Sequence, residues 1–265
     1  ALVDGQRSEA QKGVSAYCPG CGAPVIPRCG AVRIHHWAHK GKSPCAYSRE
    51  SETEWHRNWK DLFPDECQEV IHYSKSGEKH IADVKTEEGW VIEFQHSSIE
   101  KEERDSRIDF YKRMIWVIDG LRLKNDRGNF MDVIEHPAAR TSHPLIRQVA
   151  DNQACSLLGK WGDCRVPVVY DFGITDPYKG VTLWLQLPLL KSGLLLFALP
   201  KNSIVGALRS GNQTALNLLL IAAANQLPDL RPKLVFTFKN PITTRTRKGR
   251  FYHSGWRRFN RHDSM

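Results

Sequence analysis

The 265-residue sequence lacks any long hydrophobic run. The best candidate, residues 216–224, is interrupted by Asn217 and has about half the length of a membrane-spanning helix. The first residues also lack the charged and then apolar pattern of a secretory signal peptide. These absences argue against a membrane partner and against secretion, so we expect a cytoplasmic protein.

Residues 1–230 lack net charge. Residues 231–265 hold ten Lys or Arg and one acid, Asp263, which accounts for the whole net charge of +9. Within residues 241–265 the basic side chains alternate with aromatic ones. Basic groups neutralise phosphates and aromatic rings stack on unpaired bases, so we predict that this tail binds DNA, the alternative being a solubilising tail. The predicted contacts are Arg245, Arg247, Lys248, Arg250, Trp256, Arg257 and Arg258.

The seven cysteines are an odd number, which does not suit a disulfide framework. Four of them fall within residues 18–45, beside three histidines. Cys18-x-x-Cys21 is typical of a knuckle that presents two thiolates to zinc, and structural zinc needs four such ligands. We predict His39 and Cys45 as the other two, with His36 and Cys29 as alternatives. So small a segment needs its metal in order to fold, and we assign residues 1–48 to it.

Residues 81–95 read as two strands joined by a tight turn at Glu88-Gly89. In the second strand Glu93 and Gln95 share one face, beside a predicted core. A buried charge without a partner is costly, and a divalent cation between Asp83 and Glu93 would remove that cost. Mg²⁺ or Mn²⁺ takes carboxylate oxygens and keeps positions open for phosphate. We therefore predict a catalytic metal at these two acids.

The preceding segment begins with Ser51-Glu-Thr-Glu54, a capping box that predicts a helix after Ser51. Trp55 and Trp59 lie on its apolar stripe. A second stripe carries Glu52, His56 and Lys60 at steps of four. On this helix alone we interpret that stripe as a surface row of paired charges.

The next segments predict a mixed α/β fold. Strands are expected at residues 68–74, 80–86 and 89–96, then a helix over 98–114 capped by Ser97-x-x-Glu100, and a buried strand at 115–118. The order is helix, three strands, helix, strand.

This order resembles the core of the PD-(D/E)XK nuclease superfamily, and the chain more narrowly resembles the CoiA-like competence proteins. The motifs that carry the resemblance are Cys18-x-x-Cys21, His36-Trp-Ala-His39, Glu52-Thr-Glu-Trp-His56 with Lys60, Ala82-Asp83, Glu93-Phe-Gln95-x-Ser97, Arg107-x-x-x-Tyr111 and the strand at Trp116. The resemblance covers residues 17–120 and implies metal-dependent hydrolysis of DNA. It also implies a restriction-endonuclease-like core, over residues 49–121.

The resemblance implies that Asp83 and Glu93 bind the metal, that Glu52 approaches it, and that Gln95 stands where the superfamily usually has lysine. Such a lysine would stabilise phosphate charge, and glutamine supplies none. Lys60, Lys85 or Lys101 are the candidates to replace it. The predicted DNA contacts near this site are Lys60, Lys101, Arg104, Arg107 and Tyr111.

The rest of the chain shows no catalytic constellation. Residues 122–152 read as a connection with one short helix at 144–151. Residues 153–240 read as an α+β region, either a second unit or an extension of the core, with strands at 166–173, 181–187 and 194–199 and helices at 203–210 and 214–226. We interpret Asp171 at the end of the first strand as structural.

The leading hypothesis is a Mg²⁺- or Mn²⁺-dependent DNA nuclease with a structural zinc, connected with competence, recombination or incoming DNA. The main alternative is a catalytically inactive, zinc-stabilised DNA-binding accessory protein of recombination. An RNA nuclease would share the chemistry. Protein partners from recombination or defence are compatible with any of these.

Overall fold

The computed structural model describes residues 1–32, 35–41, 45, 53–74, 77, 79–151, 153–176, 180–188 and 193–209. Its first 41 residues form a five-stranded antiparallel sheet in the order β2-β1-β3-β4-β5. The strands are β1 Leu2–Val3, β2 Gln6–Arg7, β3 Ala16–Tyr17, β4 Pro24–Arg28 and β5 His36–His39. The buried residues of this sheet are few, namely Ala16, Cys18 and Val25. So small a core provides little hydrophobic stabilisation.

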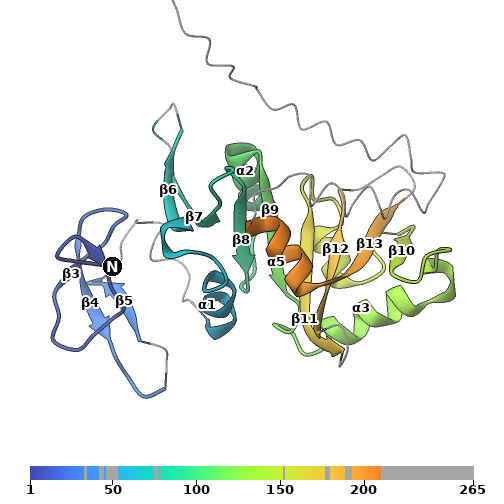
Figure 1. The fold of residues 1–265 in the computed structure, drawn as a ribbon, viewed down its shortest axis with the longest axis horizontal. Coiled ribbons are helices and arrows are strands. Elements are labelled where there is room, and N and C mark those ends of the chain that lie inside the picture. The colour runs from blue at the N-terminus through green and yellow to red at the C-terminus, as the bar shows by residue number, and fades with distance from the viewer. Residues whose placement is uncertain are drawn as a thin grey trace, which may run out of the picture. The chain divides into compact units, whose positions relative to one another are not determined.

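A second, eight-stranded sheet has the order β10-β13-β12-β11-β9-β8-β7-β6 (Figure 1). Its strands are β6 Gln68–Tyr73, β7 Lys79–Lys85, β8 Val91–Gln95, β9 Met114–Asp119, β10 Ile146–Val149, β11 Val168–Asp176, β12 Gly180–Gln186 and β13 Leu194–Pro200. The pairs β8–β9 and β9–β11 are parallel, and the others are antiparallel. The fold class is therefore mixed α/β, as predicted.

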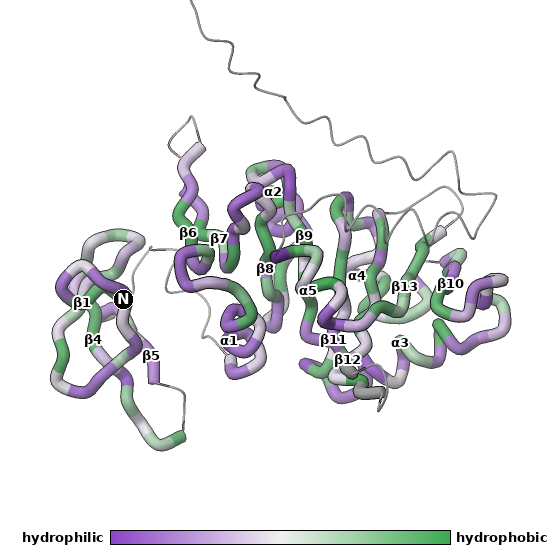
Figure 2. Tube along the Cα trace, in the orientation of Figure 1, coloured by the Kyte–Doolittle hydropathy of each residue, from purple (hydrophilic) through white to green (hydrophobic). Residues whose placement is uncertain are grey.

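Five α-helices and two short 3-10 helices accompany this sheet in the described part of the chain. They are α1 Glu54–Lys60, η2 Asp65–Cys67, α2 Lys101–Tyr111, α3 Asp126–Glu135, η3 Pro137–Ala139, α4 Ser156–Trp161 and α5 Lys201–Arg209. The central strands β8 and β9 are wholly buried, and Figure 2 shows them strongly hydrophobic beside a hydrophilic α2. A buried strand between two parallel neighbours needs apolar residues on both faces, which explains the apolar run at residues 115–118.

The strands after residue 166 extend the same sheet, because β11 pairs with β9 from Val168↔Trp116 to Asp171↔Asp119. Of the two interpretations of this region, the structure therefore shows the extension. The core follows the same continuity: Trp116 of β9, Phe130 of α3 and Tyr170 of β11 are fully buried in one hydrophobic cluster.

Several predicted boundaries are wrong. Thr53, not Ser51, caps α1 by accepting a hydrogen bond from the His56 N–H. The helix expected from residue 98 begins at Lys101, its N-cap Glu100 makes no side-chain cap, and Met114 already opens β9. The supposed connection 122–152 holds α3 and β10, while the helix expected at 144–151 is absent from its described residues. The helix expected at 214–226 lies outside the described residues.

Candidate metal centre and carboxylate site

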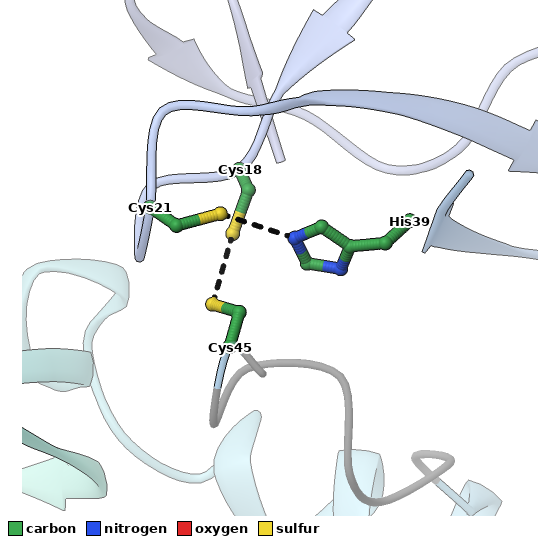
Figure 3. A group of neighbouring side chains, drawn as sticks. All are labelled: Cys18, Cys21, His39 and Cys45. Atoms are coloured by element: carbon green, nitrogen blue, oxygen red, sulfur yellow. Dashed lines mark hydrogen bonds between the residues drawn. The ribbon is translucent and has the colours of Figure 1, made fainter. Parts of the chain in front are cut away.

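Four side chains of the N-terminal sheet converge on one point (Figure 3). They are Cys18, Cys21, His39 and Cys45, and their ligand atoms all lie within 4.8 Å of one another. Cys21 Sγ is 3.2 Å from His39 Nε2, and Cys18 Sγ is 3.8 Å from Cys45 Sγ. The knuckle is closed by the Gly22 N–H, which donates to Cys18 O in a backbone with a φ of +71°. Glycine accommodates that conformation without strain.

The electrostatics of these thiols favour a cation at their centre. Burial raises the pKa of Cys18 to about 11 and also raises the pKa of Cys45. A hydrogen bond from the Ala23 backbone and the contact with His39 lower the pKa of Cys21 to about 7. Three sulfurs and one imidazole nitrogen form the donor set that structural zinc takes in tetrahedral sites. The predicted four ligands therefore fit a structural zinc.

The alternative ligands lie outside this cluster. Cys29 Sγ donates to the Ala10 carbonyl at 3.3 Å, and His36 pairs across the sheet with Arg28.

Asp83 and Glu93 meet where β7 and β8 separate. The two strands pair at Lys85↔Val91 and Val84↔Ile92. One residue further, the Asp83 side chain accepts the Phe94 N–H at 2.8 Å in place of a ladder hydrogen bond. The structure thus brings the two predicted metal ligands together: Glu93 is buried, whereas the Asp83 side chain is 23% exposed. A buried carboxylate needs compensation.

Glu93 is 1% exposed, and its two oxygens differ. Oε2 accepts from Arg107 Nη1 at 2.7 Å, whereas Oε1 has no hydrogen-bond partner among the described residues. Burial and the charge of Asp83 raise the pKa of Glu93 to about 8, although Arg107 opposes the shift. An orphaned carboxylate oxygen beside a second carboxylate is a position where a cation would replace a missing partner.

The polar stripe of α1 is not a surface row as we had interpreted it, because His56 is 9% exposed and Lys60 only 6%. His56 Nε2 lies 3.2 Å from Asp83 Oδ1, and Lys60 Nζ lies 2.8 Å from Glu69 Oε1. Burial opposes ionisation of Asp83, yet His56, the Phe94 N–H and Lys60 together lower its pKa. His56 and Glu69 are residues of this site that sequence reasoning missed. For His56 the only signal in the sequence was its four-residue spacing from Glu52 and Lys60.

Gln95 is 4% exposed, and its amide nitrogen donates to the backbone and hydroxyl oxygens of Ser97, at 3.0 and 3.1 Å. Of the three candidates for the missing cation, Lys101 is exposed and forms an ion pair with Asp163. Lys85 ends β7 and lines a groove that Gly89 and Tyr111 also line. Lys60 is the candidate whose charge acts on Asp83.

The predicted DNA contacts on α2 fall into two groups. Arg104 is 2% exposed, donates to the Lys160 carbonyl at 2.6 Å and lies over the Trp161 ring, so it does not present its guanidinium to a phosphate. Arg107 bridges Glu93 and Glu103. The hydroxyl of Tyr111 is buried and has no hydrogen-bond partner among the described residues. Burial and the charge of Glu93 raise the pKa of Tyr111. Arg107 and Tyr111 thus lie at the carboxylate site.

Asp171 has the structural surroundings we expected. Its Oδ2 accepts from Trp59 Nε1 at 2.9 Å and from Trp55 Nε1 at 3.3 Å, and its Oδ1 accepts the Gly173 N–H. The remaining predicted residues lie outside the described part of the chain: Glu52, Arg245, Arg247, Lys248, Arg250, Trp256, Arg257 and Arg258.

One comparison with known proteins gives a match. Residues 4–48 match the family model of the competence protein CoiA, N-terminal domain. No curated protein and no solved structure matches the chain. The CoiA N-terminal match contains all four clustered ligands, Cys18, Cys21, His39 and Cys45, and ends before the carboxylate site. The match therefore spans the four clustered residues, and the carboxylate site is judged on its own geometry.

In the part of the chain that the structure describes, no helix has the length and apolar character needed to cross a membrane.

Proposed function

We propose that the chain is a metal-dependent DNA nuclease of the PD-(D/E)XK type, in the setting of competence or the handling of incoming DNA. The observation that carries the proposal is the pair Asp83 and Glu93 on adjacent strands, with Glu93 Oε1 buried and without a hydrogen-bond partner among the described residues. The CoiA N-terminal match supplies the link to competence. The order α1, β6, β7, β8, α2, β9 adds support, since it is the order of elements that the superfamily resemblance implies.

Asp83 and Glu93 would hold Mg²⁺ or Mn²⁺, since both ions take carboxylate oxygens. When bound, such an ion activates water and screens the phosphate. The surrounding residues perform the rest. His56 fixes the orientation of the Asp83 carboxylate, and Lys60 contributes a positive charge that Gln95 lacks. A fixed cation beside a phosphodiester stabilises the charge that develops as the bond to the leaving oxygen breaks.

The second candidate function is a DNA-binding accessory protein without catalysis. The specific observation in its favour is the ion pair of Arg107 with Glu93 at 2.7 Å. This guanidinium already compensates one carboxylate of the pair, so the fold is complete without a second metal. The zinc module and a basic tail would then provide the function.

The deciding experiment compares Mn²⁺ binding and DNA cleavage in the wild type and in Asp83→Asn. We expect wild-type protein to bind Mn²⁺ in calorimetry and to cut labelled single- or double-stranded DNA, and Asp83→Asn to lose both while keeping its melting temperature within a few degrees. Asp109→Asn makes the same charge change at an exposed pair with Arg165 and serves as the control.

Wild-type protein that binds DNA but neither binds Mn²⁺ nor cuts DNA would establish the accessory protein instead. Cleavage of RNA in preference to DNA would change the substrate and keep the chemistry.

A further inference from the structure

Lys60 is a buried cation whose position is determined by β6. Its side chain is 8% exposed, and Nζ lies 2.8 Å from Glu69 Oε1. The neighbouring Gln68 holds the end of the same helix, because its amide nitrogen donates to the Lys60 and Phe63 carbonyls at 3.1 and 3.0 Å. Two consecutive residues of β6 therefore hold both the backbone and the ammonium group of Lys60. A lysine side chain loses much rotamer freedom when it is held in this way, so a specific contact must compensate.

Glu69 adopts an unusual backbone conformation to make this contact. Its φ is +50°, in the left-handed region that side chains other than glycine rarely adopt. Such strain persists where the surroundings determine it, and it is concentrated at functional sites. The strand pairs on either side of it, Gln68↔Val84 and Val70↔Ala82, keep their register with β7. The strain is therefore confined to Glu69, whose carboxylate lies between Lys60 and Arg7, with Oε2 at 3.2 Å from Arg7 Nη1.

The contact also holds Lys60 where its charge acts on Asp83, one carboxylate of the pair. Glu69 and Asp83 occupy opposite positions between those two register pairs, and burial followed by the Asp83 charge raises the pKa of Glu69 against the effect of Arg7. On the other side, the Lys60 charge acts on Asp83 together with that of His56. Lys60, the last residue of α1, thus contacts Glu69 of β6 directly and acts electrostatically on Asp83 of β7.

We propose that Glu69 is a positioning residue that holds Lys60 as the cation of the carboxylate site, in place of the lysine that Gln95 replaces. This inference rests on the proposed nuclease function. Glu69 acts through Lys60: it sets where the ammonium group stands beside Asp83 and therefore where positive charge meets the phosphate. Neither Lys101 nor Lys85 is held beside Asp83 in this manner.

The test uses Glu69→Gln and Glu69→Gly. The first keeps the shape of the side chain and removes its charge. The second removes the carboxylate and relieves the left-handed backbone, so it is expected to fold even if Glu69→Gln does not. Glu66→Gln, at an exposed position in η2, is the control. The first measurement is independent of activity: lysines are ¹³C-methylated and the Lys60 signal, assigned through Lys60→Arg, is followed by NMR.

We expect the Lys60 signal to be separate in the wild type and in Glu66→Gln, and to move among the signals of the exposed lysines in both Glu69 variants. Cleavage should fall about 10–100-fold in kcat in these variants, with KM for DNA and the Mn²⁺ affinity within about twofold, because charge at the phosphate is lost but the metal ligands remain. Glu69→Asp, which keeps the charge on a shorter side chain, should recover part of kcat.

An unmoved Lys60 signal, or an unchanged kcat in both Glu69 variants, overturns the role of Glu69 and leaves the nuclease proposal intact. A wild type that cuts no DNA under any metal overturns the nuclease proposal, and with it any catalytic meaning of the Lys60 contact.

Discussion

The described part of the chain contains two clusters of potential metal ligands, and they are built in different ways. At the N-terminal cluster three thiols and one histidine meet on a sheet whose core is three small buried residues. At the carboxylate site Asp83 and Glu93 lie in a large sheet, and protein cations already accompany them: His56, Lys60 and Arg107.

This difference indicates what each metal would do. A cluster of close thiols in a segment with so small a core is expected to depend on its ion for folding, since the binding free energy becomes folding free energy. A carboxylate pair that is compensated by side chains folds without an ion and binds one only where an oxygen remains free. Glu93 Oε1 is that oxygen. The first site therefore fits a structural metal, and under the proposed function the second would hold a catalytic one.

The largest expected effect is the loss of zinc. Cys18→Ser removes a buried ligand at the centre of the small core, and apparent zinc binding free energies of roughly 10–16 kcal/mol are then unavailable to the segment. We expect residues 1–41 to lose their dispersed NMR signals and to be cleaved by protease, while the signals of the eight-stranded sheet remain.

The control for this prediction is Cys29→Ser, which changes a half-buried thiol outside the cluster and should leave one zinc per chain in atomic emission spectroscopy. A Cys18→Ser variant with a folded N-terminal sheet would show that both regions fold on their own and would end the contrast between them.

The second effect is the loss of internal compensation at Glu93. Arg107→Met leaves this buried carboxylate without its guanidinium, and breaking a buried pair costs about 3–5 kcal/mol. Because Glu93 can take up a proton instead, we expect about 3 kcal/mol in urea unfolding. Mn²⁺ should restore part of this loss, since a metal ion can replace the missing cation. Arg165→Met breaks a solvent-exposed pair with Asp109 and should have a smaller effect that Mn²⁺ does not change.

Sequence reasoning identified residues that the structure brings together in both clusters where local spacing determines their position. The C-x-x-C spacing fixes Cys18 and Cys21 on one turn, and strand alternation places Asp83 beside Glu93. It failed where a partner distant in the sequence determines whether a side chain is buried. The sequence pattern of His56 and Lys60 is the same for an exposed stripe and for a buried one. Packing of α1 against β6, β7 and β8 buries them. Arg104 reads as a phosphate contact, but α4 covers it.

Glu69 was beyond sequence reasoning for a different reason. The strand pattern around Glu69 does not predict its positive φ, because residues with a left-handed backbone are usually glycine or asparagine. The strand β10 was missed because its partner β13 lies far along the chain, pairing Ile146 with Phe197.

The third effect is a pH dependence that only the carboxylate site should show. The folded-state pKa of Glu93, about 8, lies above its ordinary value of 4.5, so the folded protein holds a proton that the unfolded chain releases between these values. The stability contributed by this group therefore falls by a few kcal/mol as the pH rises from about 5 to 8. The pKa of Asp83 is lowered, so its contribution is lost only on acidification, below this window.

Urea unfolding at several pH values without divalent ions measures this slope, and Glu93→Gln should flatten it. With Mn²⁺ the slope should reverse, because the ion favours the charged carboxylate. A wild type and a Glu93→Gln variant with parallel pH profiles would show that Glu93 is not held in its protonated form.

The smallest effect compares two carboxylates of the same sheet, those of Asp171 and Asp83. Asp171 is 6% exposed, and each of its oxygens already accepts from an N–H group, so neither oxygen needs a metal as its partner. Asp171→Asn keeps the shape and loses the charge-assisted bonds from Trp59 and Trp55, for which we expect a loss of about 1.5 kcal/mol in urea unfolding. Its Mn²⁺ affinity should equal that of the wild type, whereas Asp83→Asn loses the ion. If Asp171→Asn also weakens Mn²⁺ binding, then a carboxylate oxygen without a hydrogen-bond partner is not what distinguishes a metal-binding carboxylate from a structural one in this sheet.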